Sequence, residues 1–565
     1  YRSILRTVEG WGNPIMIASA HNNLGNALLQ MGRPYEAISE FSKALGVKME
    51  AGDRYGEAVS FCGMGDSLLE LGKRDRAETF YQMILIPALE SHEAAKSRSF
   101  IASLADTAIS PPASIPQALQ EREAHLLKLE RSLQDHEAKE EVQSETYRLE
   151  RLREIRNDLQ ACWENMKPFA PEYVQLRLGE IMTLQACKSL LSSQADSSIA
   201  FVSFFCDRDS TTCFVIRSDE EKLHVFRSNI NRQELLEVAQ SLRRAFNGAP
   251  DEFPPYPPIR RDKPWKRNLS FFENLSGELL KFLPAVQGVQ LLCIAPHGPL
   301  HLLPLHALRT PDGKFLIERF ACTYFPSFST LSYLPVSKLL MSKEKPSVYI
   351  AGIASRKDEK IEFLEQDNKI FDNSRWKITM DLGTEFASRE RVLQQLSNSD
   401  YDVVHLTCHG YFDDKDPLNS GLLFSDGREK PPPDPKSVSI FDRNRYLITA
   451  RDLLRTRIGK QLMTLRACST GILAERNAGD EFEGISRSLL YAGNGSVIVS
   501  LWNVDQESSQ KLLAKFYRYW TDPEQAVPKW CALWRAQLDF LADTHERFLN
   551  HPYHWAPLIL IGDWR

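Results

Sequence analysis

A histidine and a cysteine, each at the end of an apolar run, are the residues of this sequence whose types and positions could do chemistry. The run VVHLTCHG leads to His409, and the run LMTLRAC ends on Cys468. If the two runs are parallel neighbours in a sheet, their carboxyl ends meet at one edge. An imidazole beside a thiol raises the thiolate fraction and can protonate a leaving amine. The pattern therefore predicts the Cys–His dyad of a thiol protease.

A purely structural interpretation stands beside this one. Cys468 could be a small buried side chain that closes a strand, and His405 and His409 could be core histidines. A second His–Gly pair, at His297 in CIAPHGPLH, also follows an apolar run. No cysteine-bearing run follows it at a comparable spacing, so we interpret it as a structural turn. Cys408 points away from the face of His409 by strand alternation, and we expect it to be buried.

A thiol protease also needs backbone N–H groups aimed at the oxyanion that forms during the reaction. Gly410 has no Cβ, so a substrate can approach its N–H closely. The N–H of Cys468, at the turn that follows its strand, is the natural second donor. Gly410 and Cys468 are therefore the predicted oxyanion hole.

The composition excludes several other classes of protein. The chain has 565 residues, a net charge of −5 and ten cysteines without a CxxC pair. We expect no nucleic-acid partner, since no basic excess exists, and no membrane span, since no apolar run is long enough. Metal-ligand spacings and nucleotide motifs are absent, so we expect no metal and no cofactor. Scattered cysteines suit a reducing compartment, and we expect a cytoplasmic protein.

The first part of the chain repeats itself with a period of about forty residues. Gly25 recurs as Gly65 and Gly32 as Gly72, within amphipathic patterns that predict paired helices. The pattern resembles the tetratricopeptide repeat and predicts an α-solenoid over 1–109. Tyr1 falls inside a repeat, so we expect further repeats before it. The resemblance implies a groove that binds a protein or peptide regulator.

A break at SPPASIP separates the repeats from a charged segment with leucines at helical spacing. We assign 110–165 as a linker and helical arm, packed on its neighbours, and expect it to be the only covalent route from the repeats to the sheet. A coiled-coil dimer is the alternative for this arm. From 166 onward, short β-rich runs alternate with helical ones, which predicts a mainly parallel sheet with helices on both faces.

The later motifs resemble the CHAT domain, a caspase-like fold shared with caspases and separases. The resemblance rests on VVHLTCHGYFDDKDPLNSGLLFSDG, LRACSTG, GISRSLLYAGNGSVIVSLWNVD and WAPLILIGDW. It implies that His409 is the base, Cys468 the nucleophile and Gly410 an oxyanion donor. It also implies a pseudo-caspase half over 166–340 and a catalytic half over 341–565.

Two further positions follow from the resemblance. The family usually holds a small residue two positions before the nucleophile, where this chain has Arg466. Arg466 shares a strand face with Cys468, so it either lowers the thiol pKa or blocks the pocket. The segment SLWNVDQES resembles the substrate-binding edge of separases, where an acidic residue receives a basic P1 side chain. Asp505 and Trp502 are the candidates, and Asp505 is equally a helix N-cap.

The sequence thus predicts a cysteine endopeptidase that acts on a protein substrate and is regulated through its repeats. The alternative is a catalytically inactive adaptor, in which the repeats supply the function and the CHAT fold is a docking body. Intact His409 and Cys468 favour the first interpretation, whereas Arg466 keeps the second open.

Overall fold

The computed structural model of the chain divides into two compact units. The first contains Tyr1–His92, Thr183–Gln194 and Phe214–Val225, and the second contains Glu93–Met182, Ala195–Cys213 and Phe226–Arg565. The structure describes residues 14–51, 53–106, 114–134, 142–170, 174, 177, 182–193, 198–247, 269–331, 334–335, 345–353, 367, 370–371, 375–411, 413, 417–428, 444–456, 458–467, 474–475, 482–522, 524 and 526–565.

The first unit contains the predicted helical repeats. Its helices are α2 (Pro14–Gln30), α3 (Pro34–Ala51), α4 (Arg54–Glu70), the start of α5 (Arg74–Asp106) and α9 (Leu184–Ser192). Gly32 and Gly72 end α2 and α4 with φ angles of 69° and 70°. This left-handed conformation is accessible to glycine without strain, so each helix can end in a tight turn.

The repeated glycines make room for aromatic rings of the neighbouring helix to pack directly against the helix backbone. A Cβ on Gly25 would lie 2.8 Å from the ring of Phe41, and a Cβ on Gly65 would lie 2.6 Å from the ring of Tyr81. Phe41 is fully buried, with Leu24, Leu28, Ala37 and Met64 in the same core cluster. The spacing of small residues therefore reflects helix packing, as the sequence predicts.

Helix α5 does not end with the repeats. Its second half belongs to the second unit, where Lys96 donates to the Ser203 hydroxyl at 2.8 Å and to the Ala295 carbonyl at 2.9 Å. The carboxylate of Glu93 accepts from the backbone N–H of Phe328 at 2.7 Å. The covalent connection to β1 still runs through 110–165, and the hydrogen bonds of α5 add a non-covalent connection. One helix thus begins in the repeats and contacts β1 and β4 through Lys96.

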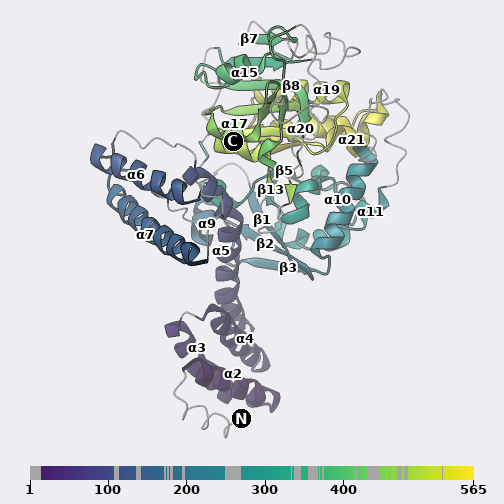
Figure 1. Ribbon diagram of the computed structural model, residues 1–565. Coiled ribbons are helices and arrows are strands. Elements are labelled where there is room, and N and C mark those ends of the chain that lie inside the picture. The colour runs from purple at the N-terminus through teal and green to yellow at the C-terminus, as the bar shows by residue number, and fades with distance from the viewer. Residues whose placement is uncertain are drawn as a thin grey trace. The chain divides into compact units, whose positions relative to one another are not determined.

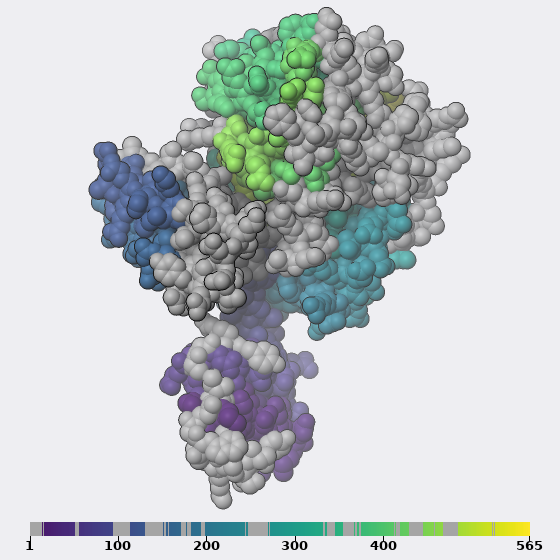
Figure 2. Space-filling model, viewed as in Figure 1, coloured from purple at the N-terminus to yellow at the C-terminus, as the bar shows by residue number. Residues whose placement is uncertain are grey.

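The segment predicted as an arm contains α6 (Gln117–Gln134) and α7 (Val142–Met166), which pack against each other. Their shared core includes Leu126, Ile155 and Leu159. Glu123 lies in this core and forms a buried ion pair with Arg177, with 2.9 Å between the Oε1 and Nε atoms. The opposite side of α6 is exposed, and Figure 2 shows the outer surface of this segment in blue.

The second unit is built on a mainly parallel sheet with strand order β10-β9-β8-β11-β14-β15-β5-β4-β1, in which β8 also pairs with β6 and β6 with β7 (Figure 1). In this part of the sheet the pairs β8–β9, β9–β10 and β14–β15 are antiparallel, and β12 pairs antiparallel with β13 apart from it. The strands along the chain are β1 (Ile199–Cys206), β2 (Thr211–Arg217), β3 (His224–Ser228), β4 (Leu291–Ala295), β5 (Ala321–Tyr324), β6 (Ser347–Gly352), β7 (Lys377–Leu382), β8 (Val403–Tyr411), β9 (Gly421–Leu423), β10 (Leu447–Thr449), β11 (Leu462–Ala467), β12 (Ala474–Glu475), β13 (Phe482–Glu483), β14 (Ser496–Ser500) and β15 (Leu558–Gly562).

The central strands are apolar on both faces because helices cover them, and every residue of β4, β6 and β14 is buried. The helices and helical turns of this unit are α10 (Arg232–Asn247), α11 (Ser270–Glu273), α12 (Ser276–Leu279), η2 (Leu283–Val286), η3 (Gly298–Leu302), η4 (Leu305–Ala307), η5 (Leu316–Glu318), α13 (Phe328–Leu331), α15 (Arg389–Leu396), η7 (Pro417–Asn419), α17 (Ala450–Arg455), α18 (Ile485–Tyr491), α19 (Gln506–Trp520), α20 (Lys529–Leu541), η8 (Arg547–Asn550) and α21 (Pro552–Trp555). Helices α19 and α20 lie side by side (Figure 1). Within the described part of the chain, no helix is long and apolar enough to cross a membrane.

Candidate active site

The strands β8 and β11 are parallel neighbours, as the dyad hypothesis requires. Their pairing begins at Leu462 opposite Val403 and its last pair is Ala467 opposite Cys408. His409 is the next residue of β8, and its side chain is partly exposed. Cys468 follows Ala467 in the sequence and lies outside the described residues. The dyad therefore stays a prediction, and the register of the two strands supports it.

Strand β8 changes its partner on one edge at His409. On that edge it pairs with β6 from Val403 to Thr407 and with the antiparallel strand β9 from His409 to Tyr411, and on the opposite edge it pairs with β11 up to Cys408. Gly410, the predicted oxyanion donor, lies opposite Leu422 in this second ladder. The backbone that carries His409 and Gly410 is therefore held by strand pairing on both sides of the change. Cys408 is buried, as strand alternation predicted.

Arg466 lies in a buried ion pair. Its Nη1 atom is 2.8 Å from Oδ1 of Asp367, and the two side chains are 3% and 1% exposed. The other carboxylate oxygen of Asp367 accepts a hydrogen bond from the Thr407 hydroxyl at 2.6 Å. The guanidinium charge is thus compensated by a carboxylate at short range. The two alternatives for Arg466, a lower thiol pKa or a blocked pocket, did not include such a partner.

Asp367 is a residue that sequence reasoning missed. It lies in FLEQDNKIF, a polar run between two apolar pairs that matches no motif, and far in sequence from both dyad strands. Arg466 was the available signal, because a cation predicted on a buried strand face needs an anionic partner. The sequence does not say which carboxylate supplies it.

A histidine deeper on the same strand is kept neutral. Burial lowers the pKa of His405 to about 4, although the charge of Asp367 opposes this shift. The Nδ1 atom of His405 is 3.5 Å from the hydroxyl of Tyr517, which also bonds the Thr464 hydroxyl at 2.7 Å. Helix α19, which carries Tyr517, therefore packs on this face of β8 and β11.

Asp505 and Trp502 lie in the loop between β14 and α19. The carboxylate of Asp505 accepts from the N–H of Ser508 at 2.9 Å, so Asp505 is the N-cap of α19. Trp502 is 2% exposed, and its indole N–H donates to the carbonyl of Tyr553 at 3.2 Å. The substrate-binding role of Asp505 stays a prediction. The burial of Trp502 favours a role in supporting the loop.

The other His–Gly pair has a defined structural role. His297 follows β4 and is 1% exposed, and its Nδ1 accepts from the backbone N–H of Cys206 at 2.9 Å. Cys206 ends β1, the parallel neighbour of β4, and its thiol donates to the His297 carbonyl at 3.4 Å. Gly298 then turns the chain with a φ of 54°. The interpretation of His297 as a structural turn is consistent with this arrangement.

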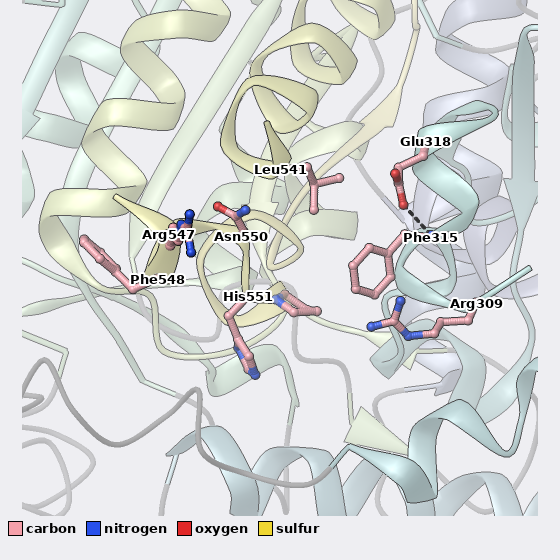
Figure 3. A pocket seen from close by; sticks show the side chains of 9 residues that line it. Arg309, Phe315, Glu318, Leu541, Arg547, Phe548, Asn550 and His551 are labelled. Atoms are coloured by element: carbon pink, nitrogen blue, oxygen red, sulfur yellow. Dashed lines mark hydrogen bonds between the residues drawn. The ribbon is translucent and has the colours of Figure 1, made fainter. Parts of the chain in front are cut away.

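A pocket of about 670 Å³ lies elsewhere in the second unit (Figure 3). Phe315 lies across it from Asn550 and His551. The guanidinium of Arg309 stacks on the ring of Phe315, 4.2 Å from its centre. Arg309 already forms an ion pair with Glu273, with 2.8 Å between the Nε and Oε1 atoms. No lining residue comes from β8 or β11, so this pocket is separate from the candidate dyad. Among the described residues, no group of three or more His, Cys, Asp or Glu side chains could hold a metal ion.

The fold and the site together define a class of protein in which helical repeats precede a mainly parallel α/β domain with a histidine at a strand end. The chain belongs to the CHAT domain family, because the CHAT domain matches residues 271–563, more than half of the chain. A tetratricopeptide repeat match covers residues 16–85. The predicted helical repeats, followed by an α/β CHAT domain with a mainly parallel sheet, are confirmed. No curated protein matches the chain.

Similar solved structures include two of the Saccharomyces cerevisiae separase–securin complex, at 3.0 and 2.6 Å resolution, with 9% and 10% sequence identity and TM-scores of 0.46 and 0.42. Each match covers 99% of this chain and 48% of the matched chain, so this chain spans about half the length of the matched one. The complex of Porphyromonas gingivalis RgpB pro- and mature domains matches 59% of this chain and 76% of its own, with 10% identity and a TM-score of 0.30.

Proposed function

We propose that this protein is a cysteine endopeptidase in which Cys468 is the nucleophile and His409 the general base. The observation that carries the proposal is the parallel pairing of β8 and β11, whose last pair directly precedes these two residues in sequence. Membership of the CHAT domain family supports it.

The proposed mechanism follows from the residue types. His409 takes the proton of the Cys468 thiol, and the thiolate attacks the scissile carbonyl. The N–H groups of Gly410 and Cys468 hold the oxyanion while the carbon is tetrahedral. The imidazolium then gives its proton to the leaving amine, and water hydrolyses the acyl-enzyme with His409 again as base. In this scheme Asp505 receives a basic P1 side chain.

The test is peptide cleavage by Cys468→Ala, His409→Ala and the double variant. Each single variant should lose activity, and the double should be hardly worse, because the two residues work as a unit. Thermal midpoints should stay close to that of the unchanged chain, since the side chain of His409 is partly exposed. Appreciable cleavage by Cys468→Ala would contradict the assignment. A chain that neither cleaves peptides nor loses function in these variants would instead support the inactive adaptor.

We propose further that a protein or peptide bound to the repeats controls this site. The continuity of α5 supports the proposal, since this helix begins at Arg74 in the repeats and its residues Glu93 and Lys96 are buried in the second unit. A ligand that favours one of two states by about 3 kcal/mol changes a minor active population on the order of a hundredfold.

Removal of the first helix pair tests this control and leaves α5 intact. A chain that starts at Asp53 keeps the N-cap of α4, because Asp53 accepts from the Gly56 N–H at 2.9 Å. If the repeats restrain the site, this chain should cleave faster than the full chain, and if they assemble the site it should cleave more slowly. Equal rates in both chains would contradict control by the repeats.

A further inference from the structure

One carboxylate ties together the two strands that lead to the proposed dyad. Oδ2 of Asp367 accepts from the hydroxyl of Thr407 on β8, and Oδ1 pairs with Nη1 of Arg466 on β11. Thr407 and Arg466 are directly opposite each other in the parallel register. Thr407 stands two residues before His409, and Arg466 stands two residues before Cys468. The contact is therefore placed symmetrically with respect to both dyad positions.

Strand alternation puts Thr407 on the same face of β8 as His409. Successive side chains of a strand point to opposite faces, so Thr407 shares its face of β8 with His409. Asp367 is fully buried on this face, beside the neutral imidazole of His405 at 3.9 Å. A polar contact at this depth fixes the lateral spacing of β8 and β11 just where their pairing ends.

Stability alone does not account for such a pair. Removing two charges from water is costly, and apolar side chains of similar volume often serve a fold as well or better. The chain contains a second pair of the same kind, Glu123 with Arg177, whose side chains are each 2% exposed. That pair lies in the core of α6 and α7, away from β8 and β11. It therefore provides an internal control for what a buried ion pair does for folding.

We propose that Asp367 is the positioning residue of the dyad, acting through Thr407 and Arg466 on the ends of β8 and β11. The proposal rests on the proposed function and extends it to the arrangement that keeps His409 and Cys468 in reacting geometry. In this proposal the guanidinium of Arg466 orients the carboxylate of Asp367, which contacts both β8 and β11. A displacement of about 1 Å between reacting groups can cost on the order of a hundredfold in rate.

The first experiment compares Asp367→Ala with Arg177→Met. We measure kcat and KM for peptide cleavage, and the rate at which iodoacetamide alkylates Cys468, followed by mass spectrometry. Asp367→Ala should lower kcat and the alkylation rate by about 10- to 100-fold and leave KM within about twofold. Arg177→Met should lower the thermal midpoint and leave both rates within about twofold. Equal rate losses in the two variants would overturn the proposal.

A milder pair of variants covers the case in which Asp367→Ala does not fold. Thr407→Val removes the hydroxyl that donates to Asp367 at nearly constant volume, whereas Thr407→Ser keeps it. Thr407→Val should lose several-fold in kcat and in alkylation rate, and Thr407→Ser should retain both. Loss in both variants, or in neither, would overturn the positioning role.

Alkylation separates this inference from the proposed function. If the unchanged chain cleaves no peptide but its Cys468 is alkylated faster than in His409→Ala, and Asp367→Ala removes that advantage, the positioning role holds and the peptidase proposal fails. If Cys468 is alkylated equally in the unchanged chain, His409→Ala and Asp367→Ala, no dyad exists and the positioning role fails with it.

Discussion

Two His–Gly pairs in this protein follow buried parallel strands, and their surroundings differ. After β4, His297 is buried, and its Nδ1 atom accepts a hydrogen bond from the backbone N–H of Cys206. Near the end of β8, His409 is partly exposed and lies just past the last pair with β11 and at the first pair with β9. Beside His297, the neighbouring strand β1 ends on Cys206, whose thiol donates to the His297 carbonyl. Beside His409, the neighbouring strand β11 ends at Ala467, and Cys468 is the next residue in the sequence.

The difference teaches that the dipeptide alone does not mark a reactive site. At β4 the imidazole accepts a hydrogen bond from the backbone of β1, the neighbouring strand. At β8 the polar contacts lie two residues deeper, on Asp367, and the histidine itself remains at the edge. Two histidines can thus share a sequence pattern while one is buried against a neighbouring strand and the other is partly exposed.

The largest predicted effect comes from the same substitution in both places. His409→Ala should reduce kcat on the order of a thousandfold, because general-base catalysis is lost, and should leave the free energy of unfolding nearly unchanged. His297→Ala should do the reverse and lower that free energy by about 2 kcal/mol, because the buried N–H of Cys206 loses its acceptor. Urea unfolding and peptide cleavage measure both.

A control sharpens this first prediction. His297→Asn supplies a side-chain oxygen that can accept from the same N–H, so it should recover part of the lost stability. If His297→Ala were as inactive per folded molecule as His409→Ala, the division into a structural and a catalytic histidine would be wrong.

The second predicted effect is a loss of stability in acid that arises in both halves. Burial lowers the pKa of His306 to about 3 and that of His405 to about 4, from 6.5. The unfolded chain therefore binds more protons between pH 6.5 and 4, so stability is complete above about pH 6.5 and falls as the pH drops towards 4. Each histidine accounts for up to about 3 kcal/mol.

Urea titrations at pH 7 and pH 5 measure this loss. His306→Gln and His405→Gln, one in each half, should each reduce the difference in unfolding free energy between the two pH values. The same pH dependence in the unchanged chain and in both variants would show that neither histidine is responsible.

The smallest predicted effect concerns Asp505. Asp505→Ala removes the N-cap of α19 and should cost about 1 kcal/mol of unfolding free energy. It should also relax any preference for Arg or Lys at P1. Asp505→Ser keeps a capping oxygen but no charge, so it should restore stability without restoring the preference. An unchanged P1 preference in both variants would reduce Asp505 to a cap.

Much of the fold could be predicted from the sequence. The glycine and aromatic repeats indicated stacked helices because close crossings need small residues at fixed points, and the apolar runs indicated parallel strands because both their faces are covered. The length of α5 could not be predicted, since its buried Glu93 and Lys96 look like surface residues until their partners on β1, β4 and α13 are known.

The candidate site was predictable only in part. His409 lies where the pairing of β8 with β11 stops, although β8 itself continues to Tyr411, and Asp505 caps α19 as its position suggested. Asp367 escaped because its role depends on a contact between distant segments, and no local pattern records which carboxylate a buried arginine will meet. Cys468 lies outside the described residues, and its role stays a prediction.

Labelling of the intact chain by a peptidyl electrophile with Arg at P1 tests the central claim most directly. Peptide mapping by mass spectrometry should find one adduct, on Cys468, which disappears in His409→Ala and persists in Cys206→Ala. Cys206 is the matched control, because it ends the strand beside the structural histidine. An adduct that forms equally in His409→Ala, or that spreads over other thiols and spares Cys468, would contradict the account.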